Sequence, residues 1–180
     1  MKEKNPFNLD VVSVRLVKDA PIMSGHPITN PEDAVLLLGK HLCEMDREVL
    51  CVINMKTDGT PINCNIASMG AINQAIVEPR EIFKSAILSN AAAMIMVHNH
   101  PSGNLEPSKE DTMITDRILT LSAYMGIPLK DHVIVGGDNS AYFSFKEKEL
   151  LKMPKVSLTQ NYHYLNFGQS AMVAERGKSR

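Results

Sequence analysis

The sequence predicts an α/β (α+β) fold in which a mixed β-sheet is sandwiched by helices. Apolar runs of strand length alternate along the chain with helix-start signals, which is the pattern of a layered domain. The strand-like runs occupy residues 48–54, 92–97 and 132–135, and the helix starts lie at 30–33, 79–81 and 108–111. The 180-residue chain is 44% apolar and 22% charged, an ordinary globular balance with room for one core.

The N-terminal part predicts one strand and one helix. Residues 12–16 alternate apolar and polar side chains, which is the period of a half-buried strand. A helix is predicted from its N-cap, Asn30, to about Met45, because proline and two acids occupy its first turn. The buried face of this helix would carry Val35, Leu38 and Leu42.

A hairpin is predicted next. Residues 48–54 form a buried strand in this interpretation, and the Asp58-Gly59 pair supplies the turn. The chain then returns as a partner strand over 61–68. A third, short strand is expected over 72–77.

The second half alternates helices and strands. A helix is expected over 79–89, and the apolar run 92–97 suits a central strand. The longest helix is predicted from Ser108 to about Met125, with Gly126 as its terminator, and two strands follow at 132–135 and 141–145. After about residue 152 the pattern decays. Residues 1–152 are therefore interpreted as one domain, and 153–180 as a C-terminal extension that could be flexible.

Bulk composition excludes several classes of protein. A net charge of −1 and a pI of about 6.6 give no basic surface of the kind that nucleic-acid-binding domains carry. No run approaches the roughly 18 to 20 apolar residues of a membrane span, and no secretory signal is visible. Cys43, Cys51 and Cys64 fit no paired zinc ribbon and are expected to be reduced. A cytoplasmic location is therefore expected.

A three-ligand metal site is predicted where the central strand ends. His98 and His100 are two residues apart, so along a strand both imidazoles point to one side. Asp111 lies eleven residues later, at the start of the long helix. Two imidazoles and one carboxylate suit zinc better than Mg²⁺ or Ca²⁺, and they leave a fourth position open, as in catalytic zinc sites.

Each of these motifs also has an ordinary structural explanation. A lone His-x-His pair is more often a pair of surface or core residues than a metal site. Residues 108–111 would make a good helix N-terminus whatever their other role. Asp131-His132, at a strand start, is interpreted as a backbone anchor, with a direct catalytic role as the alternative. Because the histidines, the loop and the helix start share one window, 98–111, the combination favours the metal site.

These residues resemble a known signature. The segments His98–Gly103 and Pro107–Asp111 are similar to the JAMM motif, His-x-His-Pro followed by Ser-x-x-Asp, of the JAB/MPN metalloprotease superfamily. The chain resembles most closely the JAB domain of the bacterial RadC family, over roughly residues 10–150. Segments that match around the motif include 70–74, 78–83, 90–93 and 131–136. The resemblance implies a JAB/MPN, cytidine-deaminase-like architecture.

The resemblance also implies roles for single residues. His98, His100 and Asp111 would bind one Zn²⁺ per chain, and Ser108 would donate a hydrogen bond to the developing oxyanion. A glutamate at the start of an early strand acts as general base in the superfamily, and Glu48 fits that place. The implied activity is that of a zinc-dependent metallohydrolase, peptidase or isopeptidase-like, which uses a metal-activated water on a peptide or protein substrate.

Two other functions stay open at this point. Fuller RadC-type chains carry helix-hairpin-helix segments before the JAB domain, and no such module is expected here. A DNA repair-associated role therefore depends on the family resemblance alone. The other alternative is a non-catalytic, metal-binding interaction domain.

Overall fold

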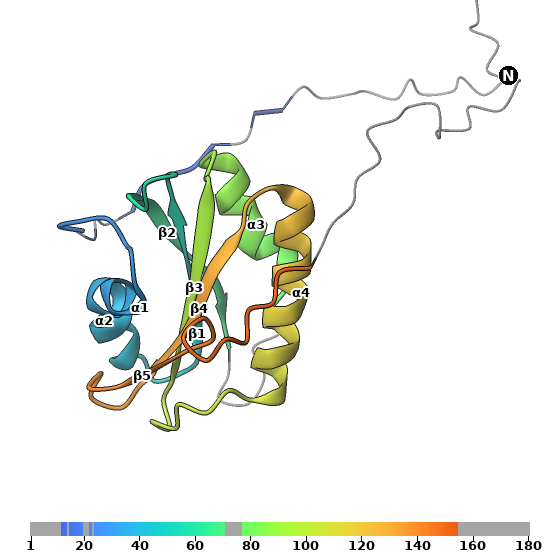
Figure 1. Ribbon diagram of the computed structural model, residues 1–180. Coiled ribbons are helices and arrows are strands. Elements are labelled where there is room, and N and C mark those ends of the chain that lie inside the picture. The colour runs from blue at the N-terminus through green and yellow to red at the C-terminus, as the bar shows by residue number, and fades with distance from the viewer. Residues whose placement is uncertain (1–11, 14, 20–21, 23, 71–76, 155–180) are drawn as a thin grey trace, which may run out of the picture.

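A five-stranded mixed sheet forms the centre of the molecule. The structure, a computed structural model, describes residues 12–13, 15–19, 22, 24–70 and 77–154 (Figure 1). The strand order is β2-β1-β3-β4-β5. β3 and β4 pair in parallel and the other neighbours pair antiparallel. The strands are β1 (Val49–Met55), β2 (Pro61–Met69), β3 (Ala93–His100), β4 (Leu129–Gly136) and β5 (Tyr142–Ser144). The predicted α/β class is confirmed.

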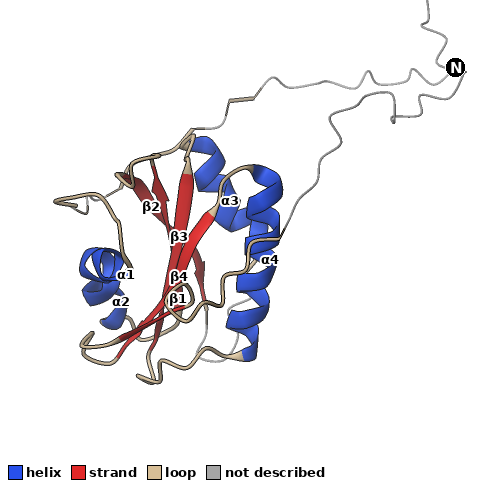
Figure 2. Cartoon of the chain, viewed as in Figure 1, coloured by secondary structure: helices blue, strands red, loops and turns tan. Residues whose placement is uncertain are grey.

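Helices cover both faces of this sheet (Figure 2). One face packs against a helix made of α1 (Pro31–Ala34), a π-helical segment η1 (Val35–Gly39) and α2 (Lys40–Cys43), and the other face packs against α3 (Pro79–Leu88) and α4 (Lys109–Met125). Each face of the sheet has its own hydrophobic core, the first under α1, η1 and α2 and the second under α3 and α4. The buried side chains of β3 alternate between these two cores. Odd-numbered residues from Ala93 to Val97 join the first core, and the even-numbered Met94 and Met96 join the second. The even positions of β3 therefore face the layer that contains α4.

The first helix forms as its sequence predicts, with one difference. The Asn30 side chain accepts a hydrogen bond from the Asp33 backbone N–H, and the Asp33 carboxylate accepts one from the Asn30 N–H. The predicted core residues Val35, Leu38 and Leu42 are all buried. A π-helical turn in the middle, which the sequence pattern does not reveal, widens the helix at η1.

The central elements also match their predicted positions. β1 and β2 form the predicted hairpin. α3 begins and ends within one residue of its predicted bounds. β3 is longer than predicted, because it continues as a strand through His100. α4 starts after the N-cap Ser108 and ends at Gly126, whose φ of 68° is the left-handed conformation that glycine adopts without strain.

One predicted strand is wrong. The described residues of 12–16 form no strand, and Val12 and Leu16 are 77% and 46% exposed. Alternation alone does not make a strand when no neighbouring strand offers backbone partners. The strand predicted over 72–77 lies, except for its last residue, outside the described residues, as does nearly all of the predicted extension 153–180. Among the described residues, none of the helices combines the length and the apolar character needed to span a bilayer.

Candidate metal centre

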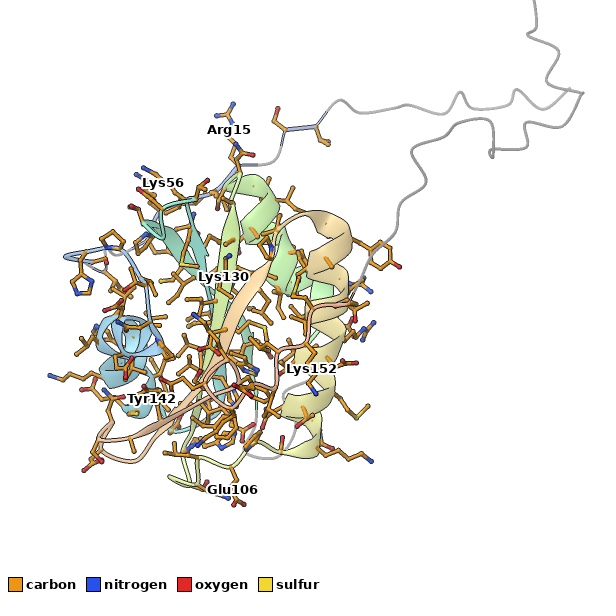
Figure 3. All side chains as sticks on the ribbon, viewed as in Figure 1. Arg15, Lys56, Glu106, Lys130, Tyr142 and Lys152 are labelled. Carbon is orange, nitrogen blue, oxygen red and sulfur yellow. The ribbon has the colours of Figure 1, made fainter. Side chains whose placement is uncertain are left out.

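The three predicted ligands meet where β3 ends and α4 begins. Glu106 lies in the loop that joins these two elements and marks this end of the molecule (Figure 3). His98 and His100 lie on the β3 side that faces α4, and Asp111 lies in the first turn of α4. The two imidazole Nε2 atoms are 2.9 Å apart. Nε2 of His98 is 3.2 Å from Oδ1 of Asp111, and Nε2 of His100 is 3.3 Å from Oδ2.

The other nitrogen of each histidine ring has a partner of its own. Nδ1 of His100 is 2.5 Å from the backbone oxygen of Asn104, in the loop after β3. Nδ1 of His98 is 2.8 Å from Nε2 of His132, a fully buried residue of β4. Nδ1 of His132 in turn lies 2.6 Å from the hydroxyl of Thr115 in α4. Both imidazole rings are therefore fixed through their Nδ1 atoms, and their Nε2 atoms face each other and Asp111.

The electrostatics of the cluster favour a bound cation. Burial alone would raise the pKa of Asp111, but hydrogen bonds with His100 and Ser108, together with the neighbouring His98 imidazole, hold it well below the usual range of aspartate. The pKa of His100 is raised, chiefly by its hydrogen bond with Asp111 and against the effect of burial; the Asn104 carbonyl and the charges of Asp111 and Glu48 also contribute. An ionised carboxylate that draws positive charge onto neighbouring imidazoles is a suitable environment for a metal ion.

The donor set fits zinc. The three side chains can each offer one ligand atom, and these atoms all lie within 4.8 Å of one another. Two imidazole nitrogens and one carboxylate oxygen are a borderline-soft set that suits zinc and related transition metals, whereas Mg²⁺ and Ca²⁺ prefer oxygen ligands. Asp111 keeps a side-chain exposure of 17%, so the cluster is reachable from solvent. The arrangement can therefore hold a metal ion.

Glu48 lies on the same side of the sheet as the histidines. Leu50 of β1 pairs with His98 of β3 in an antiparallel register, and Glu48 precedes β1 by one residue, so it lies toward the His100 end of β3. β1 alternates like β3: Leu50 and Val52 belong to the core on the α3 and α4 side. Glu48 shares this side by the period of two and is half-buried. This position agrees with the influence of its charge on His100.

Asn99 holds the backbone on both sides of Glu48. Its side-chain oxygen accepts a hydrogen bond of 2.8 Å from the Val49 N–H, and its amide donates one of 3.0 Å to the Arg47 carbonyl. Asn99 is fully buried and lies between the two histidines in sequence, on the opposite face of β3. It therefore fixes the position of Glu48 relative to the strand that carries the histidines.

Ser108 has the capping role that the sequence predicts. Its hydroxyl accepts a hydrogen bond from the Asp111 N–H at 3.0 Å and donates one of 2.6 Å to Oδ2 of Asp111. The Ser108 N–H donates to the same oxygen at 2.7 Å. Ser108 thus orients the Asp111 carboxylate. Ser108 is exposed, and its hydroxyl lies beside the cluster with its single hydrogen on the contact with Asp111.

Sequence reasoning missed Asn99 and Thr115, and it gave His132 a direct role only as an alternative. Asn99, Thr115 and His132 are polar, buried and hydrogen-bonded to the ligands or to the segment that carries Glu48. The only signal in the sequence was the Asp131-His132 pair. Asp131 has the predicted anchoring role, because it accepts hydrogen bonds from the N–H groups of His132 and Lys146. His132 contacts the site directly.

A cavity of about 330 Å³ lies away from this cluster. It is bounded by the start of α1, the β1–β2 turn and the first residues of β4, where Lys130 is labelled in Figure 3. None of the three ligands lines it. The ligand cluster therefore lies between β3 and α4, outside this cavity.

Comparisons with known proteins agree with the geometry. The family model described as "RadC-like JAB domain" matches residues 28–150. A UPF0758 protein of Clostridium tetani is 43% identical over 69% of this chain and 54% of its own length, and one of Rubrobacter xylanophilus is 41% identical over 71% and 55%. A UPF0758 protein of Methanosarcina mazei is 36% identical over 69% and 54%. These names state no activity.

The chain spans about half the length of the curated relatives it matches. The matched part contains the whole ligand cluster, from Glu48 through His132. The family model covers more than half of this chain, and it agrees with the mixed sheet and with the His-His-Asp cluster at the end of β3. The chain belongs to the RadC-like JAB domain family.

Proposed function

We propose that this chain is a zinc-dependent metallohydrolase that cleaves peptide or isopeptide bonds in a protein substrate. The observation that supports the proposal most directly is the convergence of His98, His100 and Asp111, whose ligand atoms lie within 4.8 Å of one another, beside a half-buried Glu48. A zinc ion on three protein ligands acts as a Lewis acid and lowers the pKa of a water molecule from about 15.7 to about 7.

The side chains would divide the remaining work. Glu48, held by Asn99 through its two neighbours, accepts a proton from the attacking water at its carboxylate and returns it to the leaving amine. Ser108 orients Asp111 in the free protein, and on substrate binding its hydroxyl would turn from Oδ2 of Asp111 to donate its single hydrogen to the oxygen of the scissile carbonyl, where negative charge develops. His98 and His100 hold their Nε2 atoms toward the common point.

Metal content separates this proposal from its alternatives. Mass spectrometry on the wild type should show about one zinc per chain, and His98→Ala and Asp111→Ala should lose it while staying folded by circular dichroism. Glu48→Gln should keep the zinc and lose hydrolysis across a panel of peptide and isopeptide substrates.

Two results would contradict the proposal. A wild type that takes up no zinc when zinc is supplied would remove the metal site. A zinc-loaded wild type that is as inactive as Glu48→Gln on the whole panel would leave a metal-binding interaction domain instead of an enzyme.

A further inference from the structure

We propose that Thr115 and His132 are positioning residues that fix the tautomer of His98, so that its Nε2 carries no hydrogen and faces the metal. The inference rests on the proposed metal site and concerns two residues that lie behind it. It rests on the positions of the hydrogens in a chain of three short contacts. This line of contacts runs from the Asp111 carbonyl through Thr115 and His132 to His98.

The line begins at a group that can only accept. The Thr115 hydroxyl is 2.5 Å from the backbone oxygen of Asp111, and a carbonyl oxygen has no hydrogen to give. The single hydrogen of the hydroxyl therefore lies on this contact. The second contact of the hydroxyl, 2.6 Å to Nδ1 of His132, must then take its hydrogen from the imidazole. Nδ1 of His132 is the protonated nitrogen.

The next hydrogen follows from the burial of His132. The residue is 0% exposed, and within the described part of the chain its ring nitrogens hydrogen-bond only to Thr115 and His98, neither of which is a carboxylate. A fully buried imidazole whose ring nitrogens contact no carboxylate is neutral, so Nε2 of His132 has a lone pair. The 2.8 Å contact with His98 is then a hydrogen bond donated by Nδ1 of His98. A neutral His98 is left with Nε2 as its free lone pair.

Packing keeps this line in place. The ring of Phe145 stacks on His132 with centroids 5.0 Å apart and an angle of 8° between the planes. Thr115 lies four residues after Asp111 on α4, so the same helical turn supplies the carboxylate ligand and the end of the line. His98 and Asp111 are thus linked both through the metal position and behind it. His100 has the simpler equivalent, a hydrogen bond from Nδ1 to the Asn104 carbonyl.

The removal of one hydroxyl tests the line. Thr115→Val keeps the side-chain shape, but it leaves Nδ1 of His132 without an acceptor, so the opposite tautomer, which places hydrogen on Nε2 of His98, becomes accessible. Thr115→Ser keeps the hydroxyl and is the matched control. Partners of metal-binding histidines typically contribute about 10- to 100-fold in metal affinity. We expect Thr115→Val to bind zinc about 10- to 100-fold more weakly than wild type in a chelator competition, and Thr115→Ser to stay within about threefold.

The tautomer itself is read in the metal-free protein. Long-range proton–nitrogen NMR should show hydrogen on Nδ1 of His98 in wild type and Thr115→Ser, and at least partly on Nε2 in Thr115→Val. The signals are assigned by their absence in His98→Ala. Hydrogen on Nε2 of His98 in the wild type would overturn the inference, as would equal zinc affinities of Thr115→Val and Thr115→Ser. A wild type that bound no zinc would refute the proposed function, and the NMR result would still decide the tautomer.

Discussion

Replacement of Asn99 by alanine should loosen the start of β1 and leave the metal ligands in place. The substitution removes the acceptor of the Val49 N–H and the donor to the Arg47 carbonyl. Val49 is fully buried, so its N–H would have no replacement partner, which costs about 1–3 kcal/mol. Arg47 is exposed and water can reach its carbonyl, so that loss adds little.

The expected effect is a loss of about 2 kcal/mol in the free energy of unfolding, which lowers the thermal midpoint by about 4–8 °C in a chain of this length. Hydrogen exchange measured by NMR should show that the Val49 amide loses its protection selectively. Zinc affinity should change little, because His98 and His100 lie on the other face of β3. Hydrolysis should fall, since Glu48 loses its support.

Asn54→Ala is the matched control. Asn54 is also fully buried and lies in β1, where its amide donates to Asn63 at 2.7 Å and to Ser85 at 3.0 Å, away from the ligands. This variant should lose a comparable stability without selective exposure of the Val49 amide and without a change in hydrolysis. If Asn99→Ala left Val49 protected, or if both variants behaved alike at that amide, the positioning role of Asn99 would be refuted.

Three further predictions concern the ligands, the cap and the core. Zinc affinity should fall as the pH is lowered from about 8 to about 6, because Asp111 raises the pKa of His100 and a proton held there must leave before zinc binds; a flat profile in a chelator competition would contradict this. Ser108→Ala should lower the free energy of unfolding in urea by about 1 kcal/mol, because the N-cap is removed, and should weaken zinc binding, because Asp111 is less ordered. Ser108→Asp should restore most of the stability. Equal stabilities of wild type and Ser108→Ala would argue against the cap. Met96→Ala should lower the free energy of unfolding by about 2–5 kcal/mol, because Met96 is fully buried in β3. A loss below about 1 kcal/mol in urea unfolding would show that this core is loosely packed.

The local parts of the site could be predicted from the sequence. The spacing of His98 and His100 and the helix start at Ser108–Asp111 are short-range patterns, and the structure brings these residues together as expected. Caps, turns and strand alternation depend on neighbours only a few residues apart, which explains why the bounds of α3 and α4 were also predicted closely.

The supporting residues could not be predicted because they depend on the order of the strands. Asn99 reaches residues 50 and 52 positions away, and His132 is 34 positions from His98; both contacts exist only because β3 lies between β1 and β4. The strand predicted at 12–16 is wrong because strand pairing, like these contacts, is not visible in the local sequence. Alternation describes two faces of a segment, but it does not say whether another strand pairs with it.

The division of work between the two faces of β3 sets a limit on insertions and deletions. His98 and His100 project to one face, and Asn99 projects to the other. If one residue were inserted or deleted between Met94 and Val97, the side chains after it would exchange faces, so the imidazoles would point toward α2 and the amide toward α4. Metal binding and the anchoring of Glu48 would then be lost in a single event. Loops that hold no part of the site can change in length in a natural or engineered relative, but this segment should be inherited with its length unchanged.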